Sequence, residues 1–205
     1  MAHSRILIGL SAILPLVLTL MLPGIAAAHS GEGVAGGLWS GFVHPILGPD
    51  HMIAMIAVGL WGAQLGQPLI IALPLAFPMM MAVGGVLGVL GVPLPQVELG
   101  IAVSALLLGL LVAFAFRAPV WLAVVLVGAF ALFHGHAHGT ELPAAASAIA
   151  YGIGFVIATG LLHALGIAIG LLHDWKSTGP AIVRGCGGVI AAVGAWYVMG
   201  ALSVV

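Results

Sequence analysis

Charged residues are scarce in this chain. Lys, Arg, Asp and Glu make up 4% of its 205 residues, whereas hydrophobic residues make up 63%. A soluble domain carries roughly 25% charged residues. A chain this poor in charge cannot present a solvated surface, so its outer surface must face the lipid bilayer. We therefore expect an all-α membrane protein.

Other absences remove further classes of function. The net charge is −1 and no basic patch is present, which argues against a nucleic-acid partner. A single cysteine, Cys186, excludes an internal disulfide and a multi-thiolate metal site. No Gly-rich phosphate loop of the Walker type occurs, so an ATP-driven pump would need a partner subunit. Histidine, by contrast, is abundant: nine histidines stand against four Lys plus Arg.

The first residues have the pattern of a cleavable N-terminal signal peptide. Arg5 is followed by an apolar stretch from Ile6 to Leu22, and then by three alanines that end at Ala28. Cleavage there divides the chain into a signal peptide, 1–28, and one transporter domain, 29–205. An uncleaved signal anchor, which would add a helix, is the alternative.

Six segments of the mature chain approach the roughly 20 apolar residues that a transmembrane helix needs. The predicted six-helix bundle has one domain and short connections. If the mature N-terminus is periplasmic, Arg117, Lys176 and Arg184 all fall on the cytoplasmic side, as the positive-inside rule requires. This places the protein in a bacterial inner membrane. The predicted spans are Leu38–Leu65, Pro68–Gly91, Val97–Phe116, Pro119–His138, Ala144–Leu172 and Ala181–Val204.

The first span carries polar residues at membrane depth. Asp50 lies about 18 Å along the helix from Leu38, and a carboxylate at the centre of a span costs roughly 2.5–3.5 kcal/mol on insertion scales. His51 follows it, and His44 precedes His51 by seven residues, which puts the two imidazoles on one face of a regular helix. Imidazole and carboxylate ligands suit nickel, cobalt and zinc. A kinked helix whose polar groups bond one another is the structural alternative.

Two prolines interrupt the same span. Pro45 and Pro49 lack N–H donors, so the helix loses hydrogen bonds there. The Gly48-Pro49 pair resembles a helix restart, with proline at the first helical position. Broken helices at membrane depth line cavities and mark transport sites. A restart would also aim a helix N-terminus near Asp50 and favour its ionised form.

A second histidine cluster ends the fourth predicted span. His134 and His138 are one turn apart and share a helix face, His136 points elsewhere if the helix persists, and Glu141 adds a carboxylate from the next turn. In the predicted topology both clusters lie in the periplasmic half of the membrane, so we expect them to form one site. A histidine-rich turn that binds metal incidentally is the alternative. The roles of Glu98, His163 and His29 stay open.

These two motifs resemble those of the HupE/UreJ nickel permeases. His-Pro-x-x-Gly-x-Asp-His is present at residues 44–51, and Phe-His-Gly-His-Ala-His-Gly-x-Glu at residues 133–141. The related nickel–cobalt transporters have four residues between the first His and the Asp, whereas here five separate His44 from Asp50. The resemblance covers essentially the whole mature chain. It implies secondary transport of Ni²⁺, sometimes Co²⁺, that feeds hydrogenase or urease maturation, with the first-span His and Asp residues essential.

Our hypothesis is a secondary permease that imports a divalent metal from the periplasm, with Ni²⁺ or Co²⁺ as the transported substrate and no prosthetic group. The expected metal ligands are His44, Asp50, His51, His134, His136, His138 and Glu141. An intramembrane metal-dependent hydrolase and a non-transporting metal-binding accessory protein are the alternatives. The choice of nickel over cobalt, the coupling ion and a homo-oligomeric state stay open, and maturation proteins would be indirect partners.

Overall fold

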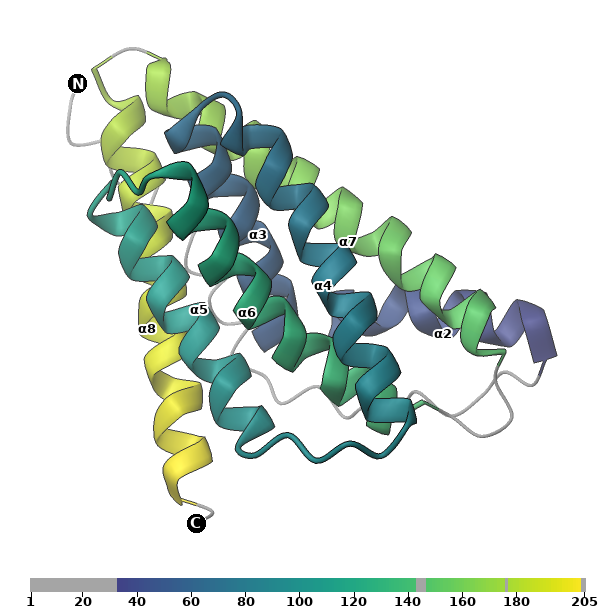
Figure 1. The fold of residues 1–205 in the computed structure, drawn as a ribbon. Helices are drawn as coiled ribbons and strands as arrows, with labels where there is room; N and C mark the ends of the chain where they lie inside the picture. The colour runs from purple at the N-terminus through teal and green to yellow at the C-terminus, as the bar shows by residue number, and fades with distance from the viewer. Residues whose placement is uncertain (1–32, 143–146, 176, 204–205) are drawn as a thin grey trace.

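The computed structural model describes residues 33–142, 147–175 and 177–203, and every regular element in them is helical. The predicted signal peptide, His29 and Lys176 lie outside these residues. An all-α fold is confirmed for the described part of the chain (Figure 1). The elements are α2 (Gly33–Leu47), α3 (Pro49–Leu65), α4 (Leu69–Val89), α5 (Val97–Ala113), α6 (Val120–Thr140), α7 (Ala148–Gly170), the 3₁₀ turn η1 (Leu171–Asp174) and α8 (Gly179–Ser203).

Four of the described segments are long and apolar enough to cross a membrane: α4, α6, α8, and α7 together with η1. A fifth candidate is the pair α2 and α3, which meet at a bend of 78°. The remaining helix, α5, has 17 residues and is shorter than these. The chain is therefore a multi-pass membrane protein by length and composition, and its six spans stay a prediction.

The predicted first span, Leu38–Leu65, is two helices rather than one. Gly48 has an extended conformation, with φ −88° and ψ 98°, and Pro49 occupies the first turn of α3. Proline has no N–H to continue the α2 ladder, and its fixed φ suits a helix start. The His44 carbonyl accepts a bond from Gly48 N–H at 3.0 Å, and the Gly48 carbonyl accepts one from Met52 N–H at 2.9 Å. The restart expected at Gly48-Pro49 is thus present, as a sharp turn.

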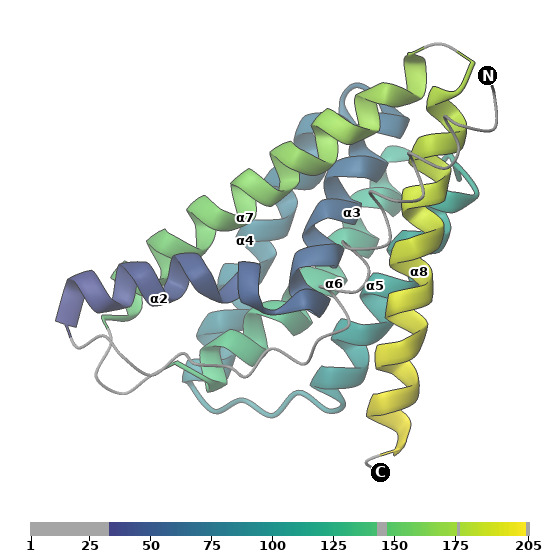
Figure 2. The same ribbon diagram turned by 180° about the vertical axis from the view of Figure 1, so that it is seen from behind.

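Helix α3 forms the centre of the bundle, and nearly all of its side chains after His51 are buried. It packs against α4, α5 and α7. Around it the other helices form close pairs: α2 with α7, α4 with α6, and α5 with α8 (Figures 1 and 2). The bend at Gly48 directs α2 away from α3 and along the first part of α7. A ligand on α2 can therefore meet one on α3 at the corner between them.

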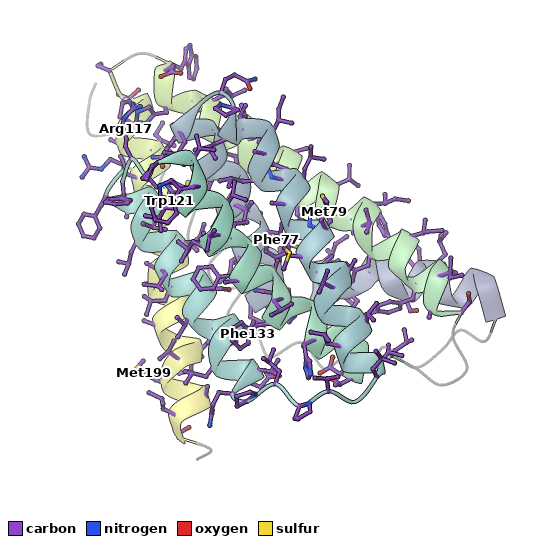
Figure 3. All side chains as sticks on the ribbon, viewed as in Figure 1. Phe77, Met79, Arg117, Trp121, Phe133 and Met199 are labelled. Atoms are coloured by element: carbon purple, nitrogen blue, oxygen red, sulfur yellow. The ribbon has the colours of Figure 1, made fainter. Side chains whose placement is uncertain are left out.

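Helices α3, α5 and α7 end at one end of the bundle, where α4, α6 and α8 begin (Figure 1). Arg117 and Trp121 lie at this end, whereas Met199 lies toward the other end of α8 (Figure 3). Arg184 is at the same end as Arg117, since its Nε donates to the Ala113 carbonyl at 2.7 Å. Two of the cations on which the predicted topology rests thus share one end. That this end faces the cytoplasm stays a prediction.

Candidate metal centre

Four histidine rings from three helices meet toward the end of the bundle opposite Arg117 and Arg184. The ring of His138 lies close to the histidines of both α2 and α3. Its centroid is 4.7 Å from that of His44 and 4.6 Å from that of His51. His134 lies 4.8 Å from His51 on the same measure. We call His44, His51, His134 and His138 the four-histidine cluster. The two sequence motifs, which are about 90 residues apart along the chain, thus form one constellation.

The break at Gly48 brings His44 close to His51. His44 lies in the last turn of α2 and His51 in the first turn of α3, and their ring centroids are 6.2 Å apart. The seven-residue spacing suggested that the two rings share one face of a single helix. They meet instead across the break between two helices. Gly48 lies against both, since a Cβ there would be 3.4 Å from His51 Nδ1 and 3.5 Å from the His44 carbonyl oxygen.

Two glycines adjoin the histidines of α6 in sequence and bring this part of the helix close to α4. Gly135 and Gly139 face α4, and each approaches the α4 backbone so closely that a Cβ would overlap it. Small residues allow such approach between helices in lipid. Gly84 and Gly88 of α4, which are also four residues apart, make the reciprocal contacts with α6. His134 and His138 have the same four-residue spacing as these glycines but lie on a different face of α6, toward the cluster.

One set of three ligand atoms is especially compact. A nitrogen of His44, a nitrogen of His138 and a carboxylate oxygen of Glu141 all lie within 4.8 Å of one another. Glu141 ends α6, with its N–H bonded to the Ala137 carbonyl at 3.0 Å. Desolvation raises the pKa of the Glu141 carboxyl above its ordinary value, and the nearby Glu98 and Asp50 carboxylates add to the rise. Two imidazoles and one carboxylate at this spacing suit a divalent transition metal.

Asp50 contacts His51 rather than standing apart as a ligand. Its Oδ1 accepts bonds from the His51 backbone N–H and from His51 Nδ1, both at 2.9 Å. Because a carboxylate oxygen only accepts, Nδ1 carries a proton, and in the neutral ring Nε2 is then the nitrogen with a free lone pair. Nε2 is buried and has no hydrogen-bond partner among the described residues. A carboxylate behind a histidine in this way fixes the ring and raises its basicity as a ligand.

His134 is oriented by a residue that the sequence did not single out. Ser104 of α5 donates its hydroxyl proton to the Ile101 carbonyl at 2.6 Å. Its oxygen therefore accepts from His134 Nε2, which lies at 2.9 Å. This leaves His134 Nδ1 unprotonated, buried, and without a partner in the part of the chain that the structure describes. A polar residue within the apolar sequence of α5 was the signal that could have revealed Ser104.

His136 does not join the cluster. Its Nε2 lies 2.7 Å from the Val92 carbonyl, which can only accept, so this nitrogen is the donor. Val92 belongs to the connection between α4 and α5, so His136 ties α6 to that connection. Of the seven predicted ligands, the structure brings together His44, His51, His134, His138, Glu141 and, through His51, Asp50.

A cavity of about 570 Å³ reaches Asp50, the residue whose carboxylate contacts His51 of the cluster. It lies where α3 and α5 begin and α8 ends. Glu98 and Tyr197 line it together with Asp50. Glu98, whose role the sequence left open, is thereby placed at the approach to Asp50.

Aromatic rings enclose the cluster on its inner sides. Phe155 of α7 lies 4.2 Å from His138 between ring centroids, and Tyr151 lies 6.0 Å from His44. Phe77 of α4 lies 5.5 Å from His134. Apolar walls of this kind limit the water around a bound ion and strengthen its electrostatic interactions with the ligands.

Comparisons with known proteins agree with the motif resemblance. A family model described as HupE / UreJ protein matches residues 16–197. Protein HupE of Rhizobium leguminosarum bv. viciae is 45% identical over 200 residues, which is 98% of this chain and 100% of that protein. No solved structure gives a significant match.

Proposed function

Because the chain belongs to the HupE/UreJ family, we propose that it is a secondary permease for a divalent transition metal. The substrate is Ni²⁺, with Co²⁺ as the second choice, and it moves from the periplasm to the cytoplasm for hydrogenase or urease maturation. One observation carries the proposal: four imidazoles gather at a broken helix of an apolar bundle, with the Asp50 carboxylate on His51 and the exposed Glu141 carboxylate beside His44 and His138. Polar groups at membrane depth cost free energy, so their presence there indicates a functional role.

The donor atoms define how the ion binds. His44, His138 and Glu141 form the compact set, and the free nitrogens of His51 and His134 extend it. Nitrogen and oxygen donors without thiolates suit nickel and cobalt and disfavour copper(I). The negative charge of Asp50 offsets part of the cost of removing water from the ion. His136 is not needed in this arrangement, because its ring bonds the Val92 carbonyl.

The cavity beside Asp50 supplies the route from the periplasm. It opens at the end of the bundle opposite Arg117 and Arg184, which is the periplasmic end in the predicted topology. Carboxylates at the mouth of a low-dielectric site attract cations and raise their local concentration. An ion that enters therefore meets the Glu98 carboxylate first. It then reaches the Asp50 carboxylate, which lies beside the cluster.

The membrane potential suffices to drive accumulation. It contributes about 2.3 kcal/mol per elementary charge per 100 mV, so about 4.6 kcal/mol for a divalent cation. At about 1.4 kcal/mol per tenfold change in concentration, this supports roughly a thousandfold gradient. No energy-coupling domain is required for uptake on this scale.

The hydrolase alternative would need a nucleophile or an activated water beside the histidines. Ser104 is the hydroxyl next to His134, but it is fully buried and its proton is donated to the Ile101 carbonyl. This geometry makes Ser104 a partner that holds the ring, since a serine nucleophile gives its proton to the histidine. Ser104 thus gives no support to a serine hydrolase, and the family to which the chain belongs favours transport over hydrolysis by an activated water.

Uptake of radiolabelled nickel by cells that express the protein tests the proposal. We expect accumulation by the wild type that excess Co²⁺ reduces, and accumulation at the empty-vector level for His51→Ala. His173→Ala, which removes a histidine at the opposite end of the bundle, is the matched control and should transport normally. With expression verified, a wild type that accumulates no more nickel than the empty vector would overturn the permease reading.

A further inference from the structure

His163 of α7 is a buried histidine outside the four-histidine cluster. It is 2% exposed, and neither ring nitrogen has a hydrogen-bond partner within residues 33–142, 147–175 and 177–203. Thr159 lies one turn earlier on the same helix face, is 0% exposed, and its Oγ1 also lacks a partner there. No hydrogen bond among the described residues therefore accounts for the burial of the His163 ring.

Such groups are expensive to bury. A neutral imidazole needs one acceptor for its N–H and one donor for its other nitrogen. Each unsatisfied group costs about 1–3 kcal/mol, whereas an apolar side chain of similar shape would cost nothing of the kind. Two adjacent orphaned groups in a membrane bundle thus mark a functional site.

Phe77 links this pair to the four-histidine cluster. Its ring is fully buried, with its centroid 5.5 Å from that of His134 and 5.3 Å from that of His163. The Phe77 ring therefore contacts both histidines. It lies on α4 between Pro74 and Pro78, which lack N–H groups and leave the carbonyls of Ile70 and Pro74 without their helical donors.

The position of His163 is deeper than the cluster. Its backbone carbonyl lies against Gly59 of α3 so closely that a Cβ on Gly59 would overlap it. Gly59 is eight residues beyond His51 on α3, or about 12 Å along the helix. His163 thus lies toward the end that bears Arg117 and Arg184, which is the direction in which an imported ion travels.

We propose that His163 and Thr159 form a second binding station for the transported divalent ion, separated from the four-histidine cluster by the Phe77 ring. The proposal rests on the permease function. The ion passes from His134 to His163 when the Phe77 ring turns aside, so the ring divides an outer station from an inner one. With one imidazole and one hydroxyl from the protein, the inner station binds more weakly than the cluster, as release toward the cytoplasm requires.

Equilibrium binding of Co²⁺ to the purified full chain in lipid nanodiscs tests this. We expect the wild type to bind two equivalents and His163→Leu to bind one, with the dissociation constant of the tighter site unchanged. In a His51→Ala/His138→Ala background, which disables the cluster, the weak equivalent remains and His163→Leu removes it. His173→Leu is the matched control and keeps both equivalents.

Uptake and stability complete the test. His163→Leu should lower nickel uptake at least about tenfold, the lower end of the effect that ligand-supporting residues have on metal sites. It should raise or preserve the melting temperature, because it removes two unsatisfied nitrogens. Thr159→Val, which keeps the shape of the side chain, should weaken the second equivalent alone and serves if His163→Leu does not fold.

The outcomes separate the two proposals. A wild type that binds one equivalent, loses it in His51→Ala/His138→Ala and keeps it in His163→Leu overturns the inner station while leaving the permease intact. Wild-type uptake by His163→Leu also overturns it. A wild type that binds Co²⁺ but accumulates no nickel overturns the permease, and the inner station with it.

Discussion

Gly88 offers a test of how the α4–α6 contact sets the geometry of the metal centre. A Cβ added there would lie 2.5 Å from the His136 carbonyl oxygen and 3.0 Å from both Gly139 Cα and Thr140 N. Ordinary contact begins at 3.4 Å, so in Gly88→Ala the two backbones must part by about 0.9 Å, an overpacking that typically costs 1–3 kcal/mol. The neighbouring backbone atoms belong to the turn that carries His138 and Glu141, so these ligands move with it.

The expected loss follows from that displacement. A misplacement of about 1 Å at a reacting centre can cost roughly a hundredfold, so we expect nickel uptake to fall by about 10–100-fold in Gly88→Ala. Gly85→Ala is the matched control. It is on the same helix, and its Cβ would lie 3.6 Å from the Gly135 carbonyl oxygen, which is ordinary contact.

Radiolabelled nickel uptake and the affinity of the purified protein for Co²⁺ should be measured for both variants at equal expression. Alanine favours a helix over glycine by about 1 kcal/mol, so Gly85→Ala should be at least as stable as the wild type. If Gly88→Ala binds and transports metal as Gly85→Ala does, the ligand geometry does not depend on this helix contact and the reasoning is refuted.

Three further substitutions test the roles of single side chains. Asp50→Asn keeps the oxygen that His51 contacts but removes the charge, and calorimetry should show metal affinity reduced by about 10–100-fold; an unchanged affinity would exclude the supporting role of the carboxylate. Ser104→Ala removes the acceptor of His134 Nε2, so a denaturation experiment should show the free energy of unfolding lowered by about 1–3 kcal/mol, and metal affinity should fall measurably. A variant that is as stable as the wild type and binds metal as tightly would contradict this role of Ser104. His136→Ala should leave metal affinity within about twofold of the wild type, because that ring is directed away from the cluster, and a complete loss of binding would instead make it a ligand.

Local chemistry predicted much of the site. The two prolines and Gly48 predicted a helix restart before Asp50, and the structure has one there. The spacing of His134 and His138 predicted a common face, and both rings lie toward the cluster. These features depend on neighbours within two helical turns, whose geometry is fixed by the 3.6-residue period and by the missing proline N–H.

The features of the site that the sequence did not predict depend on residues that are distant along the chain. Pro49 predicts a break but not its angle of 78°, nor the packing of α2 against α7 that accompanies it. The contact of Ser104 with His134 joins residues of different helices, and neither motif contains it. The sequence predicted Asp50 as a ligand, which stays a prediction, but it did not predict that Oδ1 of this carboxylate would accept bonds from the backbone N–H and Nδ1 of His51.

The bond between Asp50 and His51 also has a consequence for biogenesis. The broken segment leaves the ribosome before the helices that complete the site, and His138 follows Asp50 by 88 residues. At about 5–20 residues per second, the segment waits roughly 4–18 s for α6 to be synthesised. Because Asp50 and His51 are neighbours in sequence, their bond forms without any later helix. The carboxylate can therefore enter the membrane already paired with His51, before any later helix is made.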